Sequence, residues 1–253
     1  MRNILLTIKY DGTNYAGWQR QSGKRTVCGR LEEVLSSYFD MDIKLEGTSR
    51  TDAGVHALGQ RATLRADINV PIEKLAQVIN TALADDRLEG ISDIEIVDAK
   101  EMPEGFHARF DSKGKRYIYK IRNTKDIDIF KKNYCFHVRE PLDLEAMKKA
   151  AEHIVGTHDF ACFQTAGGNP VSTTVRTVSS LTIEKENEYL IVKIEGDGFL
   201  YNMVRIIAGT LIEVGQGKIK PEEIKNIIEA KDREMAGQTA PAKGLTLMGY
   251  RMS

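Results

Sequence analysis

The chain has few cysteines and no long apolar run, and both shortages exclude classes of protein. Its 253 residues include three scattered cysteines, Cys28, Cys135 and Cys162, which form no CxxC pair. This pattern indicates no disulfide framework and suits a reducing compartment, so we expect a cytoplasmic protein. No run approaches the roughly 18 apolar residues of a membrane span, and the one at residues 4–8 is too short for a signal peptide.

Histidine is scarce too, and its spacing predicts no metal site. Among the five histidines, His153 and His158 are neighbours in sequence, but an i, i+5 pair does not share a helix face. We therefore expect no metal.

Net charge is absent as well, because 36 basic residues balance 36 acidic ones. Zero charge argues against a nucleic-acid binder overall, but local distribution matters more. Between residues 113 and 125 there is no acidic side chain among six basic ones: Lys113, Lys115, Arg116, Lys120, Arg122 and Lys125. This stretch predicts a positive, phosphate-binding face. An ordinary solvated strand edge explains it equally well.

What is present is an apolar content of 42%, enough for a full core. Apolar spacing predicts strands and helices in a similar order in the two halves of the chain. In the first half we expect strands at 4–10, around 45 and at 94–96, with helices at 27–38 and from 71. In the second we expect strands at 117–121 and 245–250, a hairpin at 181–194, and helices at 144–154 after the cap Asp143, at 200–214 and from 221.

This order predicts an α+β fold of two related α/β units, with antiparallel or mixed sheets, helices packed on them and an active-site cleft between them. We expect an N-terminal catalytic-loop domain at residues 1–108 and a C-terminal domain at 109–253.

The most informative segment is the small and polar stretch from Gly47 to Gln60. Arg50 and Asp52 are two residues apart, so their side chains point the same way in an extended chain. Glycines on both sides allow a ligand close to the backbone. The alternative is a turn in which Asp52 only hydrogen-bonds its own backbone.

Two further residues are candidates for chemistry. Arg205 is the one basic residue in the apolar helix expected at 200–214, and a buried guanidinium needs an anionic partner. That partner is Asp52 in the functional interpretation; otherwise Arg205 reaches solvent or pairs with Glu213 or Asp197. Tyr117 alternates with Tyr119 like a core residue of a strand, but its basic neighbours also fit a platform for base stacking.

The segment Arg50–Ala57 resembles the catalytic loop of the tRNA pseudouridine synthase A (TruA) family, in which the aspartate is the essential carboxylate. Met203–Arg205 resembles the family's arginine segment, and Arg116–Tyr119 its Arg-Tyr-x-Tyr motif. Other resembling segments lie at 10–19, 106–110, 158–160 and 244–245. One departure is Ser49, where many members have glycine.

The resemblance implies a tRNA pseudouridine synthase, an isomerase that converts uridine to pseudouridine. It implies Asp52 as the catalytic carboxylate, Arg205 as its partner and Tyr117 stacked on the uracil, with Arg50, Lys115, Arg116 and Leu245 also binding substrate. It further implies no cofactor and a homodimer that binds the tRNA anticodon arm, with uridines 38, 39 and 40 as substrates. Two other classes stay open: a non-catalytic RNA-binding module and a nucleoside-type glycosidase, which requires a second carboxylate.

Overall fold

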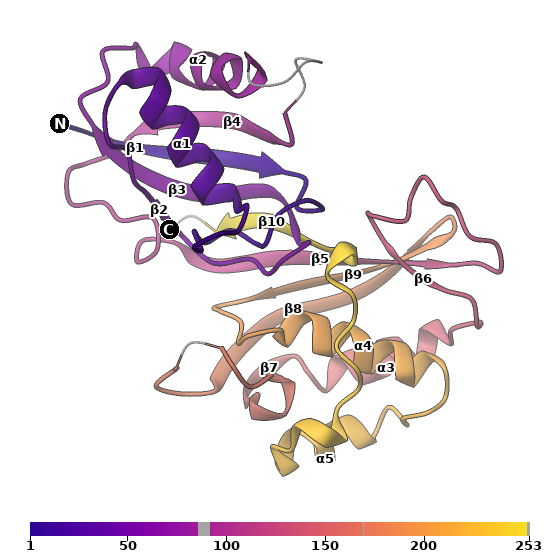
Figure 1. Ribbon diagram of the computed structural model, residues 1–253. Coiled ribbons are helices and arrows are strands. Elements are labelled where there is room, and N and C mark those ends of the chain that lie inside the picture. Colours follow the sequence, from indigo (N-terminus) through magenta and orange to yellow (C-terminus); the bar gives the residue numbers. More distant parts are fainter. Residues whose placement is uncertain (86–91, 169, 252–253) are drawn as a thin grey trace. The chain divides into compact units, whose positions relative to one another are not determined.

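The computed structural model describes residues 1–85, 92–168 and 170–251. The chain divides into two compact units, one of Met1–Lys113 with Leu247–Ser253 and the other of Gly114–Thr246. Both contain helices and strands, which confirms the mixed α+β class (Figure 1). The domain division at 108 and 109, the relatedness of the two halves and the cleft stay predictions.

The first unit consists of antiparallel strands and two helices. Its elements are β1 (Arg2–Tyr10), α1 (Val27–Phe39), β2 (Leu45–Gly47), β3 (His56–Ala66), α2 (Ile72–Asp85), β4 (Ile94–Glu101) and the larger part of β10 (Leu245–Arg251). β1 pairs with β3 on one side and β4 on the other, and β2 pairs with β3. α1 packs against α2, and α2 against β4 (Figure 1).

The second unit has a sheet in the order β5-β9-β8-β7, with β6 parallel to β5 and the other pairs antiparallel. α3 packs against α4 and β8, and α5 against β7. The elements are β5 (Lys113–Asn123), β6 (Phe136–Val138), α3 (Leu144–Glu152), β7 (Gly156–Asp159), η1 (Ala161–Phe163), β8 (Val175–Glu186), β9 (Tyr189–Gly196), α4 (Met203–Gly215), α5 (Glu223–Ala230), η2 (Arg233–Met235) and η3 (Ala242–Gly244).

The helix cap predicted at Asp143 is confirmed. Its carboxylate accepts a hydrogen bond from the backbone N–H of Ala146 at 3.0 Å, which satisfies one free donor of the first turn of α3. The helix ends at Glu152 rather than at Ile154. The N–H of Ile154 bonds to the carbonyl three residues earlier, which tightens the last turn.

The helix predicted at 200–214 is α4, and it begins at Met203. The preceding residue, Asn202, has a left-handed φ of 61°, which a continuous right-handed helix does not allow. The apolar side chains of α4 are buried as predicted. Because α4 begins at Met203, Asn202 lies just before the helix and close to Arg205, the predicted site residue.

Candidate active site

The loop between β2 and β3 alternates between buried and exposed side chains. Ser49 and Thr51 are buried, whereas Arg50 is exposed and Asp52 is half-buried. Such alternation is what an extended chain produces. Both charged side chains of the motif are therefore accessible, while the hydroxyl side chains that alternate with them anchor the loop.

Two buried tyrosines hold these anchoring hydroxyls. The oxygen of the Tyr10 hydroxyl lies 2.7 Å from Thr51 Oγ1, and that of Tyr250 lies 2.6 Å from Ser49 Oγ. The Tyr250 hydroxyl donates to Gln60 Oε1 at 2.5 Å, so it accepts from Ser49. Gln60 Nε2 donates to the Ser49 backbone carbonyl at 2.9 Å, which closes a ring of hydrogen bonds among three residues.

The segment after β1 supports the loop through its backbone. The N–H of Trp18 donates to the Thr51 carbonyl at 3.1 Å, and the N–H of Gly54 donates to the Tyr15 carbonyl at 3.2 Å. Gly17 has a φ of +94°, and a Cβ there would lie 2.5 Å from the Thr51 carbonyl oxygen. Glycine is therefore required at this position. These contacts give the predicted motif at 10–19 a structural role.

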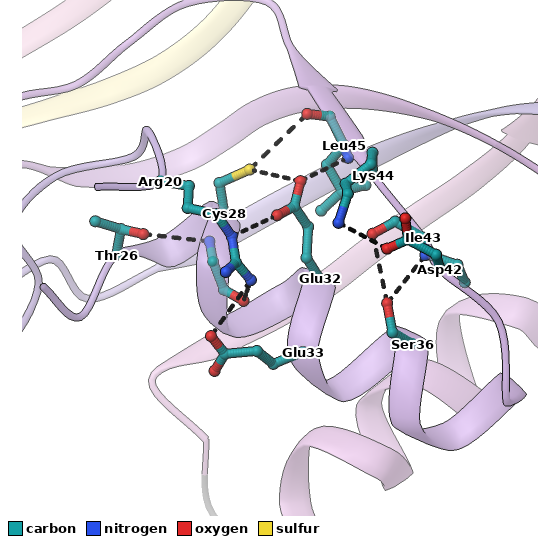
Figure 2. A network of polar contacts seen from close by, with 11 residues as sticks. Arg20, Thr26, Cys28, Glu32, Glu33, Ser36, Asp42, Ile43, Lys44 and Leu45 are labelled. Atoms are coloured by element: carbon teal, nitrogen blue, oxygen red, sulfur yellow. Dashed lines mark hydrogen bonds and ion pairs between the residues drawn. The ribbon is translucent and has the colours of Figure 1, made fainter. Parts of the chain in front are cut away.

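A buried carboxylate fixes β2, the strand that leads into the loop (Figure 2). Glu32 of α1 accepts from the Leu45 N–H at 3.0 Å and from Arg20 Nε at 2.8 Å, and Cys28 Sγ lies 3.6 Å away. Burial, with a contribution from Glu32, raises the pKa of the Cys28 thiol to about 12. Cys28 is therefore a neutral thiol that packs, not a nucleophile.

In the second unit, Arg205 has polar partners close to its own helix. It is half-buried, and its Nε donates to the Ala240 carbonyl at 2.8 Å while Nη1 donates to Asn202 Oδ1 at 2.8 Å. The Ala240 N–H in turn donates to the Arg205 carbonyl at 3.1 Å. The left-handed Asn202 and the segment before η3 thus hold the guanidinium of Arg205 through Nη1 and Nε.

Tyr117 is buried in β5, as its alternation with Tyr119 predicts. Its ring meets Phe199 edge to face, with ring centroids 5.5 Å apart and planes at 84°. This burial fits the core role; the stacking role stays a proposal.

The residues just before Leu245 in sequence pack tightly against Tyr119, which lies on the same face of β5 as Tyr117. The Tyr119 hydroxyl donates to the Pro241 carbonyl at 2.8 Å, and a Cβ on Gly244 would lie 2.6 Å from the Tyr119 ring. Leu245 itself is buried at the start of β10. The chain segment that leads to Leu245 therefore packs against Tyr119, two residues after Tyr117 in β5.

The basic stretch is not one positive face. β5 pairs regularly with β9 from Lys115 to Arg122, so its side chains alternate. Lys115 falls on the face of Tyr117, and Arg116 and Lys120 fall on the opposite face. The sequence groups them as one cluster because it shows charge but not the side of the sheet.

Arg122, another member of that stretch, is engaged within the fold. It is buried, and its Nε lies 3.0 Å from Glu188 Oε1. Hydrogen bonds from Arg122 and then Lys131 lower the pKa of Glu188 to about 2. Arg122 therefore stabilises the β8–β9 turn region and is a poor candidate for phosphate binding.

The predicted site residues are distributed over both units. Arg50 and Asp52 share one loop of the first unit. The second unit holds the other five: Lys115, Arg116, Tyr117, Arg205 and Leu245. The pairing of Asp52 with Arg205 stays a prediction.

Comparisons with known proteins cover parts of both units, although Lys115, Arg116 and Tyr117 lie between the segments that the family model matches. A family model described as tRNA pseudouridine synthase matches residues 6–111 and 150–251, which include both the Asp52 loop and the Arg205 helix. The chain belongs to the tRNA pseudouridine synthase A family.

Relatives from several bacteria carry that name and match along almost the whole chain. The protein from Thermoanaerobacter sp. strain X514 is 47% identical over 98% of both chains. The one from Acetivibrio thermocellus is 44% identical over 98% of both, and the one from Halalkalibacterium halodurans is 43% identical over 97% of this chain and 90% of its own. As a synthase A family member, the chain is an intramolecular isomerase.

Sequence reasoning missed three residues that support the Asp52 loop: Tyr10, Gln60 and Tyr250. Tyr10 and Gln60 lie in segments with a clear local pattern, but that pattern marks them only as parts of a strand or loop. Tyr250 is 201 residues from its partner Ser49, and no local pattern signals that contact.

Within the described residues, no group of three or more histidine, cysteine, aspartate or glutamate side chains is placed to hold a metal ion. No described helix is both long and apolar enough to cross a membrane.

Proposed function

We propose that this synthase converts uridines 38, 39 and 40 of the tRNA anticodon arm to pseudouridine, as a cytoplasmic homodimer without a cofactor. The observation that carries the proposal is the loop of Asp52. Its inward neighbours are buried and hydrogen-bonded, whereas Asp52 and Arg50 stay accessible. A carboxylate on a fixed loop, with a basic residue two positions away, suits chemistry on an anionic polymer.

The reaction breaks the bond between N1 of uracil and C1′ of ribose, rotates the base and joins C5 to C1′. The C5 proton leaves and N1 gains a proton, so substrate and product are isomers. One carboxylate is sufficient because the base stays bound and no water attacks, unlike in glycosidases that use two carboxylates. Asp52 acts either at C1′ or as the base.

The other predicted residues then have defined tasks, with the cleft between the units as the proposed site. Arg205 pairs with Asp52 and keeps it ionised. Tyr117 stacks on the uracil of the extruded nucleotide, which has to leave the helix to be reached. Phosphates are bound by Arg50, Lys115 and Arg116, and Leu245 also binds the substrate.

Mapping the product in a tRNA transcript tests the substrate. A transcript with uridines at positions 38, 39 and 40 is incubated with enzyme, labelled with a carbodiimide that marks pseudouridine, and read by primer extension. We expect stops at these three positions, and each should vanish when that uridine is replaced by cytidine. Stops confined to other positions, or none, would contradict the proposal.

A further inference from the structure

The two tyrosine–hydroxyl contacts bracket the outward residues of the loop. Ser49 and Thr51 lie on either side of Arg50, and Thr51 directly precedes Asp52. Each is held by a buried tyrosine, Tyr250 and Tyr10, which are 4% and 3% exposed. We call these four residues the tyrosine clamp.

The clamp, together with Gln60, joins three strands to one short loop. Tyr10 ends β1, and Tyr250 comes from β10 at the other end of the chain. Gln60 of β3 connects the Tyr250 hydroxyl to the Ser49 carbonyl and also accepts from the Arg61 N–H at 3.0 Å. Strand positions are rigid relative to a loop, so hydroxyls held from strands limit how far the loop moves.

We propose that Tyr10 and Tyr250 are positioning residues that set the orientation of Asp52 through Thr51 and Ser49. They do not touch the reacting atoms; they restrict the backbone that carries the carboxylate. The inference rests on the proposed role of Asp52, because small displacements of a reacting group cost rate.

Ser49 supplies the loop's side of the Tyr250 contact. Its hydroxyl lies 2.6 Å from the Tyr250 hydroxyl, and both residues are buried. We therefore expect the Tyr250 arm of the clamp to depend on Ser49.

Native-state proteolysis tests the clamp without using activity. Trypsin cuts after Arg50 only when the loop opens, and under rapid opening and closing the cleavage rate follows the open population. Tyr250→Phe keeps the ring and removes the hydroxyl, so we expect cleavage at Arg50 to rise roughly 2- to 10-fold, as for the loss of a neutral hydrogen bond. Ser49→Ala, which removes the other end of the same bond, should give a similar rise.

Ser36→Ala is a matched control in the same unit. Its hydroxyl accepts from the Ile43 N–H at 3.0 Å, away from the clamp. It should leave cleavage at Arg50 unchanged. A global loss of stability would instead raise cleavage at many lysines and arginines together, and fragment masses separate the two cases.

Steady-state kinetics gives the second readout. Tyr10→Phe and Tyr250→Phe should each lower kcat about 2- to 10-fold and leave the KM for tRNA unchanged, with Ser36→Ala like wild type. If cleavage at Arg50 and kcat are unchanged in both tyrosine variants, the clamp does not position Asp52. If cleavage rises while Asp52→Asn keeps full activity, the clamp holds the loop but the proposed role of Asp52 is wrong.

Discussion

A single buried side chain, Glu32, holds the start of β2, the strand that leads into the Asp52 loop. It accepts hydrogen bonds from the Leu45 N–H of β2 and from Arg20, and it is 6% exposed (Figure 2). Its neighbour Glu33 contacts the same arginine at 3.3 Å but is exposed. Two carboxylates on one helix turn thus differ in burial, in the contact with Cys28 and in the backbone donor that Glu32 satisfies.

Glu32→Ala should lower the free energy of unfolding by about 1–3 kcal/mol, because it leaves the Leu45 N–H buried without its acceptor. Glu33→Ala should change it by no more than about 0.5 kcal/mol. Urea denaturation of both variants and wild type in one buffer makes the comparison. Equal effects of the two substitutions would show that the buried contact contributes nothing special.

At this scale the sequence predicts the outward residues of the site but not their supports. Arg50 and Asp52 stand two apart in a glycine-flanked stretch, which is a local signal. The contact of Ser49 with Tyr250 joins residues at opposite ends of the chain, and only the folded structure shows it. The burial argument predicts an anion beside Arg205, yet a backbone carbonyl and an amide oxygen are among its partners.

At the scale of elements, β5 shows what alternation adds to a charge pattern. The period of two predicts the buried face of Tyr117, Tyr119 and Ile121. The same period separates Lys115 from Arg116, although they are adjacent in sequence. Helix ends are harder to predict, because the left-handed Asn202 that delays α4 is a backbone conformation, not a composition.

If Lys115 and Arg116 both bind phosphates, replacing both by alanine should weaken tRNA binding and flatten its salt dependence. The slope of log affinity against log salt should fall in magnitude by about 0.7–0.9 for each phosphate that is no longer neutralised. Lys218→Ala/Lys220→Ala removes two exposed charges from the same unit and serves as the control. Titrations at several salt concentrations give the slopes. Identical slopes in all three proteins would place the RNA footprint elsewhere.

At the scale of the whole molecule, the proposed site takes its carboxylate from one compact unit and its arginine from the other. The family model matches both the Asp52 loop and the Arg205 helix, so both lie in the parts of the chain that identify the family. Element order does not predict that most of β10 belongs to the first unit, since pairing between distant strands leaves no local pattern.

If Arg205 pairs with Asp52, the two residues should be coupled in stability. Breaking a fully buried pair on one side costs about 3–5 kcal/mol, and these half-buried groups should cost less. Arg205→Leu should be less stable than Asp52→Ala/Arg205→Leu, with both inactive. Denaturant midpoints of wild type, both single variants and the double variant give the cycle at one fixed protein concentration. Strict additivity would show that the residues do not interact, and Arg50 would be the next candidate.

Tritium release from tRNA labelled at C5 of uridine tests the central claim most directly, namely that Asp52 performs the isomerisation. Wild type and the exposed control Asp42→Asn should release tritium, because C5 loses its hydrogen when it bonds to C1′. Asp52→Asn should release none while binding tRNA nearly as well as wild type, since phosphates are held elsewhere. Release by Asp52→Asn at close to the wild-type rate, or free uracil that keeps its tritium with the wild-type enzyme, would contradict the account.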